Sequence, residues 1–278
     1  MKRAAIVIAV LGTCICSWAQ DKPATQTAPA GQAATAPQGK RQPAAKTQPE
    51  FDAYKAALQL TDAAAAEKAA DDFAAKFPDS ELRVVLYKAA MQRYQAANNG
   101  DKMLELSQKA LTIDADDPEA LVGVAQVLAE RTRDTDLDKD QKLAEAKKNA
   151  ERALVTVDTD VPTAGYPPEK VDQFKRYMRS EAYAVLGTLA SNAHNYPEAE
   201  TNLRKSIDVF PEQVDSVAVL RLAVVLDMQN KIPDALKVAN QAVDLTKDHP
   251  DSPAGKAARA EQDRLTKLSS GSAPGQKN

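Results

Sequence analysis

Residues 180–213, SEAYAVLGTLASNAHNYPEAETNLRKSIDVFPEQ, decide the fold of this chain. Before a break at residues 195–197, small and apolar residues recur at helical spacing on one face: Tyr183, Leu186, Gly187 and Ala190. A second stripe and a closing proline follow the break: Ala199, Leu203, Ser206 and Pro211. Small residues at Gly187 and Ala199 would let two antiparallel helices approach closely. The pattern predicts a helical hairpin, which needs neighbours on either side to bury both of its faces.

The same stretch resembles a tetratricopeptide repeat, a helical hairpin of about 34 residues with this order of aromatic, small and proline positions. Ala190 and Ser206 depart from the family pattern, and the other signature positions match in kind. Weaker copies of the pattern lie at residues 87–111, 111–125 with 146–154, and 219–243. The resemblance implies an all-α solenoid of stacked antiparallel hairpins. It also implies a non-catalytic scaffold that binds a protein or peptide segment on the concave face of the array.

One repeat domain is therefore expected over residues 50–268, since an array of repeats grows as one unit. The expected hairpins and the expected capping helix span residues 51–78, 81–115, 118–157, 169–211, 214–247 and 254–268. Residues 269–278 are expected to be a disordered tail. The helix that begins near residue 169 keeps its apolar phase through residue 193, so its first turns require a partner that covers Phe174.

The first 19 residues have the pattern of a secretory signal peptide. Lys2 and Arg3 precede an apolar run at residues 4–11, and a small-residue site ends at Ala19, where cleavage is expected. The mature protein would then lie in the periplasm or cell envelope. Two alternatives remain open: residues 4–19 could anchor the chain in a membrane, or Cys14 could be lipidated. Residues 20–49, rich in Ala, Pro, Gln and Thr, predict a disordered linker that either gives the array reach or has no role.

Composition excludes several classes of function. The net charge is −3 with both signs spread along the chain, which gives no reason to expect a nucleic-acid partner. Both cysteines lie in the leader, so no thiol chemistry is expected in the mature chain. His194 and His249 fall in turn segments without a nucleophile at a recognisable spacing. We therefore expect neither an enzyme nor a cofactor.

One acidic segment has a spacing close to that of an EF-hand calcium loop. The candidate oxygen ligands are Asp134, Asp136, Asp138, Asp140 and Glu145. Lys139 stands where the loop needs a glycine, and Lys142 adds a positive charge beside the site. The alternative is that Asp138 caps the following helix in a capping box with Gln141 and that the other carboxylates are solvated. An envelope structural module with this calcium loop is the second functional hypothesis.

The resemblance also assigns residues to the concave face. By position in the repeat these are Lys88, Gln92, Gln95, Val122, Gln126, Ala184, Thr188 and Asn192. Some members of the family clamp a terminal carboxylate with basic and amide residues. Here only Lys88 fits that clamp, because Gly123, Glu181 and Val185 occupy the other positions. A carboxylate clamp is not expected.

The helix predicted at residues 216–228 is apolar on two faces. Val219, Leu222, Ala223 and Leu226 form a stripe expected to pack on the next helix. A second stripe, rotated by roughly 200° at 100° per residue, comprises Val217, Leu220, Val224 and Met228. This second stripe falls on concave positions and is a candidate contact for a partner or for a second copy of the chain. The alternative is that a tightly curved array buries it completely.

Overall fold

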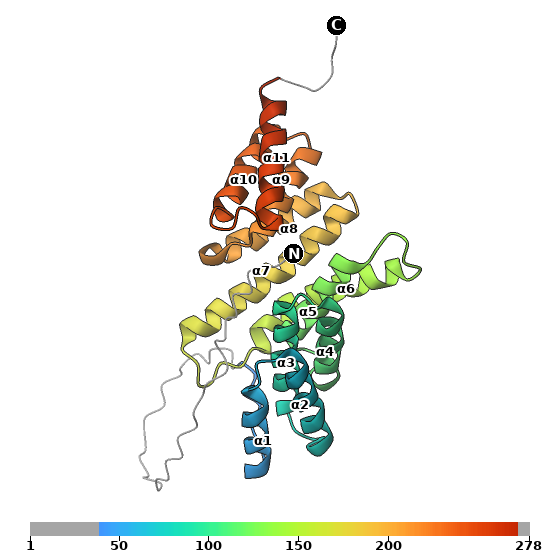
Figure 1. Ribbon diagram of the computed structural model, residues 1–278, viewed down its shortest axis with the longest axis vertical. Coiled ribbons are helices and arrows are strands. Elements are labelled where there is room, and N and C mark those ends of the chain that lie inside the picture. Colours follow the sequence, from blue (N-terminus) through green and yellow to red (C-terminus); the bar gives the residue numbers. More distant parts are fainter. Residues whose placement is uncertain (1–38, 272–278) are drawn as a thin grey trace, which may run out of the picture.

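The computed structural model describes residues 39–271, and within them it contains eleven α-helices and one short 3₁₀ turn. The predicted all-α fold is confirmed. Ten of the helices form antiparallel hairpins in chain order (Figure 1): α1 (Gln48–Leu58) with α2 (Ala63–Lys76), α3 (Leu82–Ala96) with α4 (Gly100–Ile113), α5 (Pro118–Arg131) with α6 (Lys139–Thr159), α7 (Pro168–Asn192) with α8 (Tyr196–Val209), and α9 (Ser216–Met228) with α10 (Ile232–Leu245). The last helix, α11 (Pro253–Ser269), packs on α10 and α9.

The hairpins stack along the long axis of the molecule, with α1 at one end and α11 at the other (Figure 1). The helices pack chiefly on their neighbours in the chain, and α5 also packs on α7. This is the nearest-neighbour organisation of a solenoid, in which each hairpin buries the face that the previous one leaves open.

Local chemistry explains where the helices begin and how the hairpins turn. Asp62, Asn99, Asp117, Asp215 and Ser252 cap their helices, each accepting a hydrogen bond from a backbone N–H of the first turn. The turns inside the second, fourth and fifth hairpins each contain one left-handed residue, with φ between 56° and 59°: Asn98, His194 and Asn230. Asparagine adopts this conformation more readily than most residues.

The α7–α8 hairpin has the predicted close crossing. A Cβ placed on Gly187 would lie 2.7 Å from Cγ of Leu203, which leaves no room for any side chain. Ala199 and Leu203 are completely buried beside it. The Ser206 hydroxyl has a polar partner in this buried crossing, since its Oγ lies 3.3 Å from Ser180 Oγ, which also donates to the Ser206 carbonyl over 2.8 Å.

The first turns of α7 are covered as the sequence requires. Phe174 is 9% exposed and packs with Val157 at the end of α6 and Val161 in the following connection. Tyr177, one turn further on, meets the Phe210 ring edge-on at 6.1 Å between ring centroids. The long connection after α6 therefore folds back onto the protruding part of α7.

The described part of the predicted linker differs from the prediction. Residues 39–47 make defined contacts with the array, and α1 already begins at Gln48, where Thr47 provides the N-cap. The prediction that residues 20–49 form a disordered linker is therefore wrong for residues 39–49. The predicted leader, residues 20–38 and residues 272–278 lie outside the described residues. Within residues 39–271, no helix is both long and apolar enough to cross a membrane.

Candidate functional site: a concave cavity and an apolar stripe

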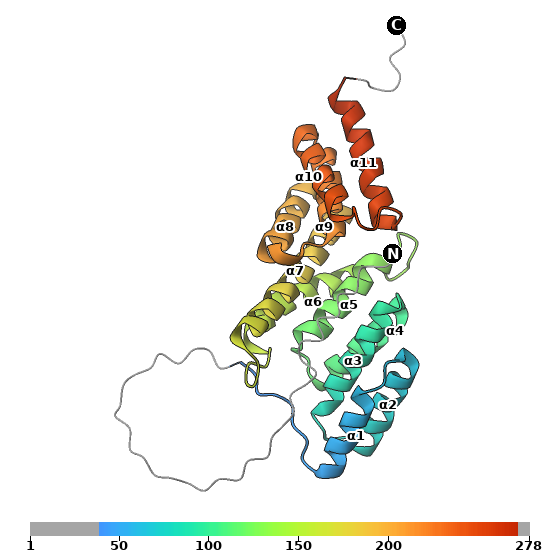
Figure 2. The ribbon, with the colours of Figure 1, turned by 60° about the vertical axis from the view of Figure 1, so that its left-hand side comes forward.

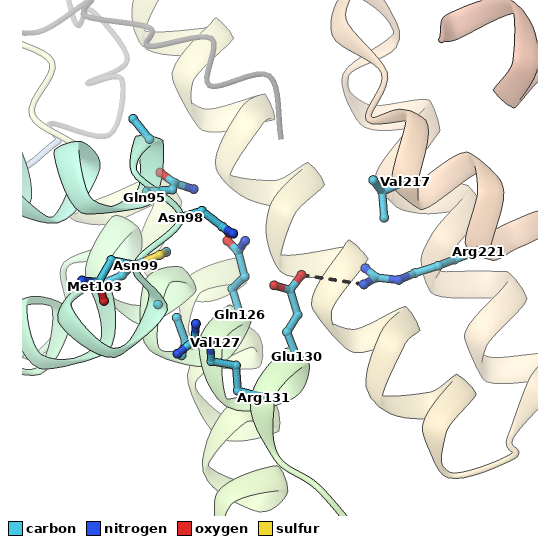
Figure 3. Close-up of a pocket in the computed structure, with 12 residues that line it drawn as sticks. Gln95, Asn98, Asn99, Met103, Gln126, Val127, Glu130, Arg131, Val217 and Arg221 are labelled. Carbon is cyan, nitrogen blue, oxygen red and sulfur yellow. Dashed lines mark ion pairs between the residues drawn. The ribbon is translucent and has the colours of Figure 1, made fainter. Parts of the chain in front are cut away.

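A cavity of about 240 Å³ opens between the α3–α4 turn, the end of α5 and the start of α9 (Figure 3). Its lining combines amide side chains, paired charges and a few apolar residues: Gln95, Ala96, Asn98, Asn99, Gly100, Met103, Gln126, Val127, Glu130, Arg131, Val217 and Arg221. Three hairpins thus contribute to one opening. The wall formed by α5 is central, because its last turns face both the α3–α4 turn and α9.

The charged groups of the cavity are paired within the protein. Glu130 of α5 and Arg221 of α9 form an ion pair across the opening, with 3.7 Å between the two side chains (Figure 3). Arg131 pairs with Asp101 at 2.5 Å. Gly100 makes room for Arg131, since a Cβ there would lie 2.7 Å from the arginine Nε. An occupant of the cavity would therefore meet mainly amide groups rather than free charges.

A smaller depression adjoins the cavity where α7 comes close to α5. Gln126, Glu130 and Arg221 line both hollows, and Glu181, Ala184, Val185 and Thr188 supply the side from α7. Gln126 is only 6% exposed, so it lies at the base of the surface. The concave face is continuous from the α3–α4 turn to α9.

Three of the residues assigned by the repeat resemblance meet in the cavity: Gln95, Gln126 and Val217. Val122 lines neither hollow, because it is 4% exposed within an apolar cluster between α5, α6 and α7. Thr188 lines only the smaller depression, where it is 7% exposed and its hydroxyl donates to the Ala184 carbonyl. The repeat position gives the side of a helix, whereas the packing of the next hairpin decides whether that side stays open. Asn192 is exposed at the end of α7.

Lys88 and Gln92 lie outside the cavity and bridge α3 to α5. Lys88 Nζ is 2.7 Å from Asp117 and 3.2 Å from Glu119, and Gln92 donates to Glu119. Burial opposes the charge of Lys88, but the two carboxylates outweigh burial and raise its pKa. Lys88 therefore remains protonated and neutralises two carboxylates of the protein itself. It stabilises the contact between α3 and α5 and is not free to clamp a carboxylate of a partner.

The cavity also contains residues that the sequence pattern did not identify. Asn98, Asn99 and Arg131 lie in or beside hairpin turns, which the repeat pattern treats as variable. Arg221 lies within a helix whose apolar residues dominate the sequence pattern. The stacking of the hairpins brings α9 opposite the end of α5, and no local pattern encodes this arrangement.

The two stripes of α9 differ in burial. Val219, Leu222, Ala223 and Leu226 are at most 2% exposed, as expected for the packing stripe. In the second stripe of this helix, called the α9 stripe below, Val217 and Leu220 are half-buried, while Val224 and Met228 are 39% and 54% exposed. Complete burial, the alternative considered for this stripe, does not fit Val224 and Met228. Because Val217 also lines the cavity, the stripe continues the concave surface along α9.

The acidic segment before α6 does not form the set of ligands that a calcium loop requires. Lys139 binds Asp134 at 2.6 Å, and Lys142 binds Asp136 at 3.3 Å and Asp138 at 2.9 Å. Within residues 39–271, no three His, Cys, Asp or Glu side chains are grouped so that they could hold a metal ion. The proposed ligands, including Asp140 and Glu145, are therefore not brought together.

The capping box proposed as the alternative for this segment is not formed either. Asp138 occupies the position before α6, but its carboxylate accepts no capping hydrogen bond from the helix and pairs with Lys142 instead. Lys139 and Lys142 thus form ion pairs with the carboxylates that a calcium loop or a capping box would use.

No family model and no curated protein matches the chain. Among solved structures, the chain is similar to the assembly chaperone of RpL4 (Acl4), with 15% sequence identity. The match covers 80% of this chain and 98% of that chain, with a TM-score of 0.37. At this score the similarity is one of helical arrays, and the role of the cavity has to be judged from its own residues.

Proposed function

We propose that this protein is a non-catalytic scaffold that binds an extended segment of another protein on the face formed by the cavity and the α9 stripe. The observation that carries the proposal is the continuity of these two surfaces through Val217. Amide side chains both donate and accept hydrogen bonds, so those of Gln95, Asn98 and Gln126 suit the peptide groups of an extended chain. Exposed apolar side chains that adjoin a polar hollow are typical of a contact surface.

The paired charges of the face support the same occupant. Glu130 and Arg221 neutralise each other, as do Arg131 and Asp101, so the cavity offers no excess charge to a phosphate or a carboxylate. An apolar side chain of the partner would lie on Val224 and Met228 while its backbone reaches the amides. The histidines give no support to catalysis: His194 stacks on Tyr196 in an exposed turn, and His249 is exposed in the last connection.

A pair of charge substitutions tests the proposal. The bait is the protein without its first 19 residues, and interacting proteins are captured from an extract of the source cells. Val224→Arg should abolish capture of a stoichiometric partner, because a guanidinium would stand in the middle of the apolar stripe. Val155→Arg is the matched control, since Val155 is 72% exposed on α6. Equal capture by the two variants would place the contact elsewhere, and turnover of a small-molecule substrate would contradict a scaffold.

A second copy of the chain is an alternative occupant of the same surface. Sedimentation of the purified protein over a range of concentrations distinguishes it from a foreign partner. A dimer that Val224→Arg dissociates and Val155→Arg does not would assign the α9 stripe to self-association.

We also propose that the protein is exported to the periplasm or cell envelope, on the basis of the leader pattern at residues 1–19. Sequencing of the mature N-terminus tests this proposal. A first residue at Gln20 would fit cleavage after Ala19, and a modified Cys14 at the N-terminus would indicate lipidation instead. An intact Met1 on the mature chain would contradict cleavage.

A further inference from the structure

Residues 39–47, called the strap below, run along the edge of the array where successive hairpins are connected. Figure 2 shows this segment leading from α1 toward the start of α7. The strap contacts three connections: residues 77–81 between α2 and α3, residues 114–117 between α4 and α5, and residues 160–167 between α6 and α7. The strap therefore crosses the first three hairpins.

Lys40 makes the central contacts of the strap. Its Nζ lies 2.6 Å from both carboxylate oxygens of Asp114 and 3.3 Å from Asp160. Its backbone N–H donates to the Thr159 carbonyl over 3.0 Å. Partial burial opposes the charge of Lys40, but the two carboxylates raise its pKa. One residue thus ties the connection before the third hairpin to the connection after it.

The segment around Lys40 is fitted closely to the α6–α7 connection. A Cβ on Gly39 would lie 2.6 Å from both Thr163 Cγ2 and the Val161 carbonyl oxygen, so the backbone passes where no side chain fits. Gln42 adds a hydrogen bond from its side chain to the Ala164 carbonyl. These contacts join residues more than 100 positions apart in the sequence.

The strap is also tied to the connection between the first two hairpins. Lys46 Nζ, at the other end of the strap, donates to the Asp79 carbonyl over 2.8 Å, and Arg41, next to Lys40, pairs with Glu81 just before α3. Glu50 of α1 is 3% exposed and accepts a hydrogen bond from the Lys46 N–H at 2.6 Å. Burial opposes ionisation of Glu50, but the polar surroundings that Ser80 and the Lys46 and Thr47 backbones provide outweigh burial and lower its pKa.

We propose that the strap is a conformational device that couples the first three hairpins, with Lys40 as its main contact. In a solenoid each hairpin normally contacts only its neighbours, so its stability is not linked directly to that of more distant hairpins. α1 and α2 pack on each other and on α3, yet the strap joins their end of the array to the α6–α7 connection. Coupling of this kind limits bending between α3 and α5, which supply the walls of the concave cavity.

Hydrogen exchange measured by mass spectrometry on the full chain tests the coupling. Lys40→Ala should accelerate exchange by roughly three- to tenfold in residues 159–167, which lose their ion pair with Lys40, and also in residues 79–83, which stay bound to a strap that Lys40 no longer anchors. Lys55→Ala is the matched control: it removes the same charge from an exposed position on α1. Acceleration confined to residues 39–47, or equal effects of the two variants, would overturn the proposal.

Two further measurements keep the test decisive if Lys40→Ala loses helical structure. Lys40→Arg retains the charge and the donors, so it should restore wild-type exchange; behaviour like that of Lys40→Ala would overturn the role of the ion pairs. Raising the salt concentration from 0.05 to 0.5 M should shift the wild type toward Lys40→Ala, because the side chains of Lys40 and Arg41 are partly exposed and therefore screened. Exchange that is insensitive to salt would also overturn it.

Discussion

The array is held together differently at two of its interfaces between hairpins. Where α3 meets α5, the concave side is closed by Lys88, whose side chain is 20% exposed, with Asp117 and Glu119 at 8% and 13%. Where α7 meets α9, the contact is made by apolar residues such as Ala184, Val219 and Leu222. Both halves have an apolar core, so the difference lies in how the contact between successive first helices is closed: by buried charge at α3 and α5, and by apolar side chains at α7 and α9.

The difference has a functional consequence. An ion-pair bridge occupies the concave side of α3 and α5, so little apolar surface remains there. Because the α9 packing stripe buries its own residues on α7, α8 and α10, the opposite α9 stripe stays partly open. We therefore expect a partner to gain most of its apolar contact in the second half of the array and its polar contact at the cavity between the halves.

Gly187→Leu should have the largest effect on stability. The added Cβ would overlap Leu203 and lie 3.2 Å from the Leu203 backbone nitrogen, so the α7–α8 crossing must open. Overpacking of this kind costs about 3 kcal/mol of unfolding free energy. Urea denaturation measures it, and Asn192→Leu at the exposed end of α7 is the control. A neutral result for Gly187→Leu would show that apolar packing does not dominate this half.

The close crossing at Gly187 illustrates what the sequence can predict. Helical periodicity, caps and small residues act within about one hairpin, so the helices, their order and this crossing follow from local pattern. The long α7 and the need to cover Phe174 follow from the same periodicity.

Long-range features could not be predicted in this way. Lys40 and Asp160 are 120 residues apart, and nothing near either residue specifies the other. Val122 has a concave position in the repeat but is buried in a cluster with Ala153 of α6 and Ala182 of α7, which nothing in its local sequence specifies. The candidate site was therefore predicted only where the array leaves a first helix open, as at Gln95, Gln126 and Val217.

Lys88→Met should have the second largest effect, about 2–3 kcal/mol, because it leaves Asp117 and Glu119 without a counter-ion in a mostly buried site. Lys55→Met, at an exposed position on α1, is the control. The pKa of Lys88 is raised by folding, so its contribution is complete below about pH 10.4 and declines as the pH rises through the higher folded value. Equal urea midpoints for the two variants would show that charge does not hold the α3–α5 interface.

Glu200→Gln should have a smaller effect, about 1 kcal/mol at neutral pH. Glu200 of α8 binds Lys231 at 2.6 Å and Gln229 at 2.9 Å, so the polar tie between the last two hairpins lies at the α9–α10 turn. Burial opposes its ionisation, but hydrogen bonds from Lys231, Gln229 and Arg204 outweigh burial and lower its pKa.

The sign of this pKa shift determines the pH dependence. A carboxylate whose pKa is lowered by folding stabilises the protein above about pH 4.3, and that contribution is lost as the pH falls further. Glu200→Gln should therefore lose less stability than the wild type between pH 5 and pH 3. Glu169→Gln, at an exposed position in the first turn of α7, is the control. If the unfolding free energies of the wild type and Glu200→Gln fall in parallel between pH 5 and pH 3, ionised Glu200 does not stabilise the contact between the last two hairpins.

The double substitution Leu220→Ser with Val224→Ser should leave the protein folded and distinguishes an open stripe from a buried one. Leu220 is half-buried and Val224 is 39% exposed, so the expected loss is below about 2 kcal/mol, with unchanged helical circular dichroism. Leu222→Ser, in the 2% exposed packing stripe of the same helix, is the matched control and should cost at least about 3 kcal/mol. If the double variant unfolds as readily as Leu222→Ser, the α9 stripe belongs to the core and the apolar half of the proposed binding surface is lost. If it stays folded while capture of a partner or self-association disappears, the two faces of α9 have separate roles, one in holding the array together and one in contacting another chain.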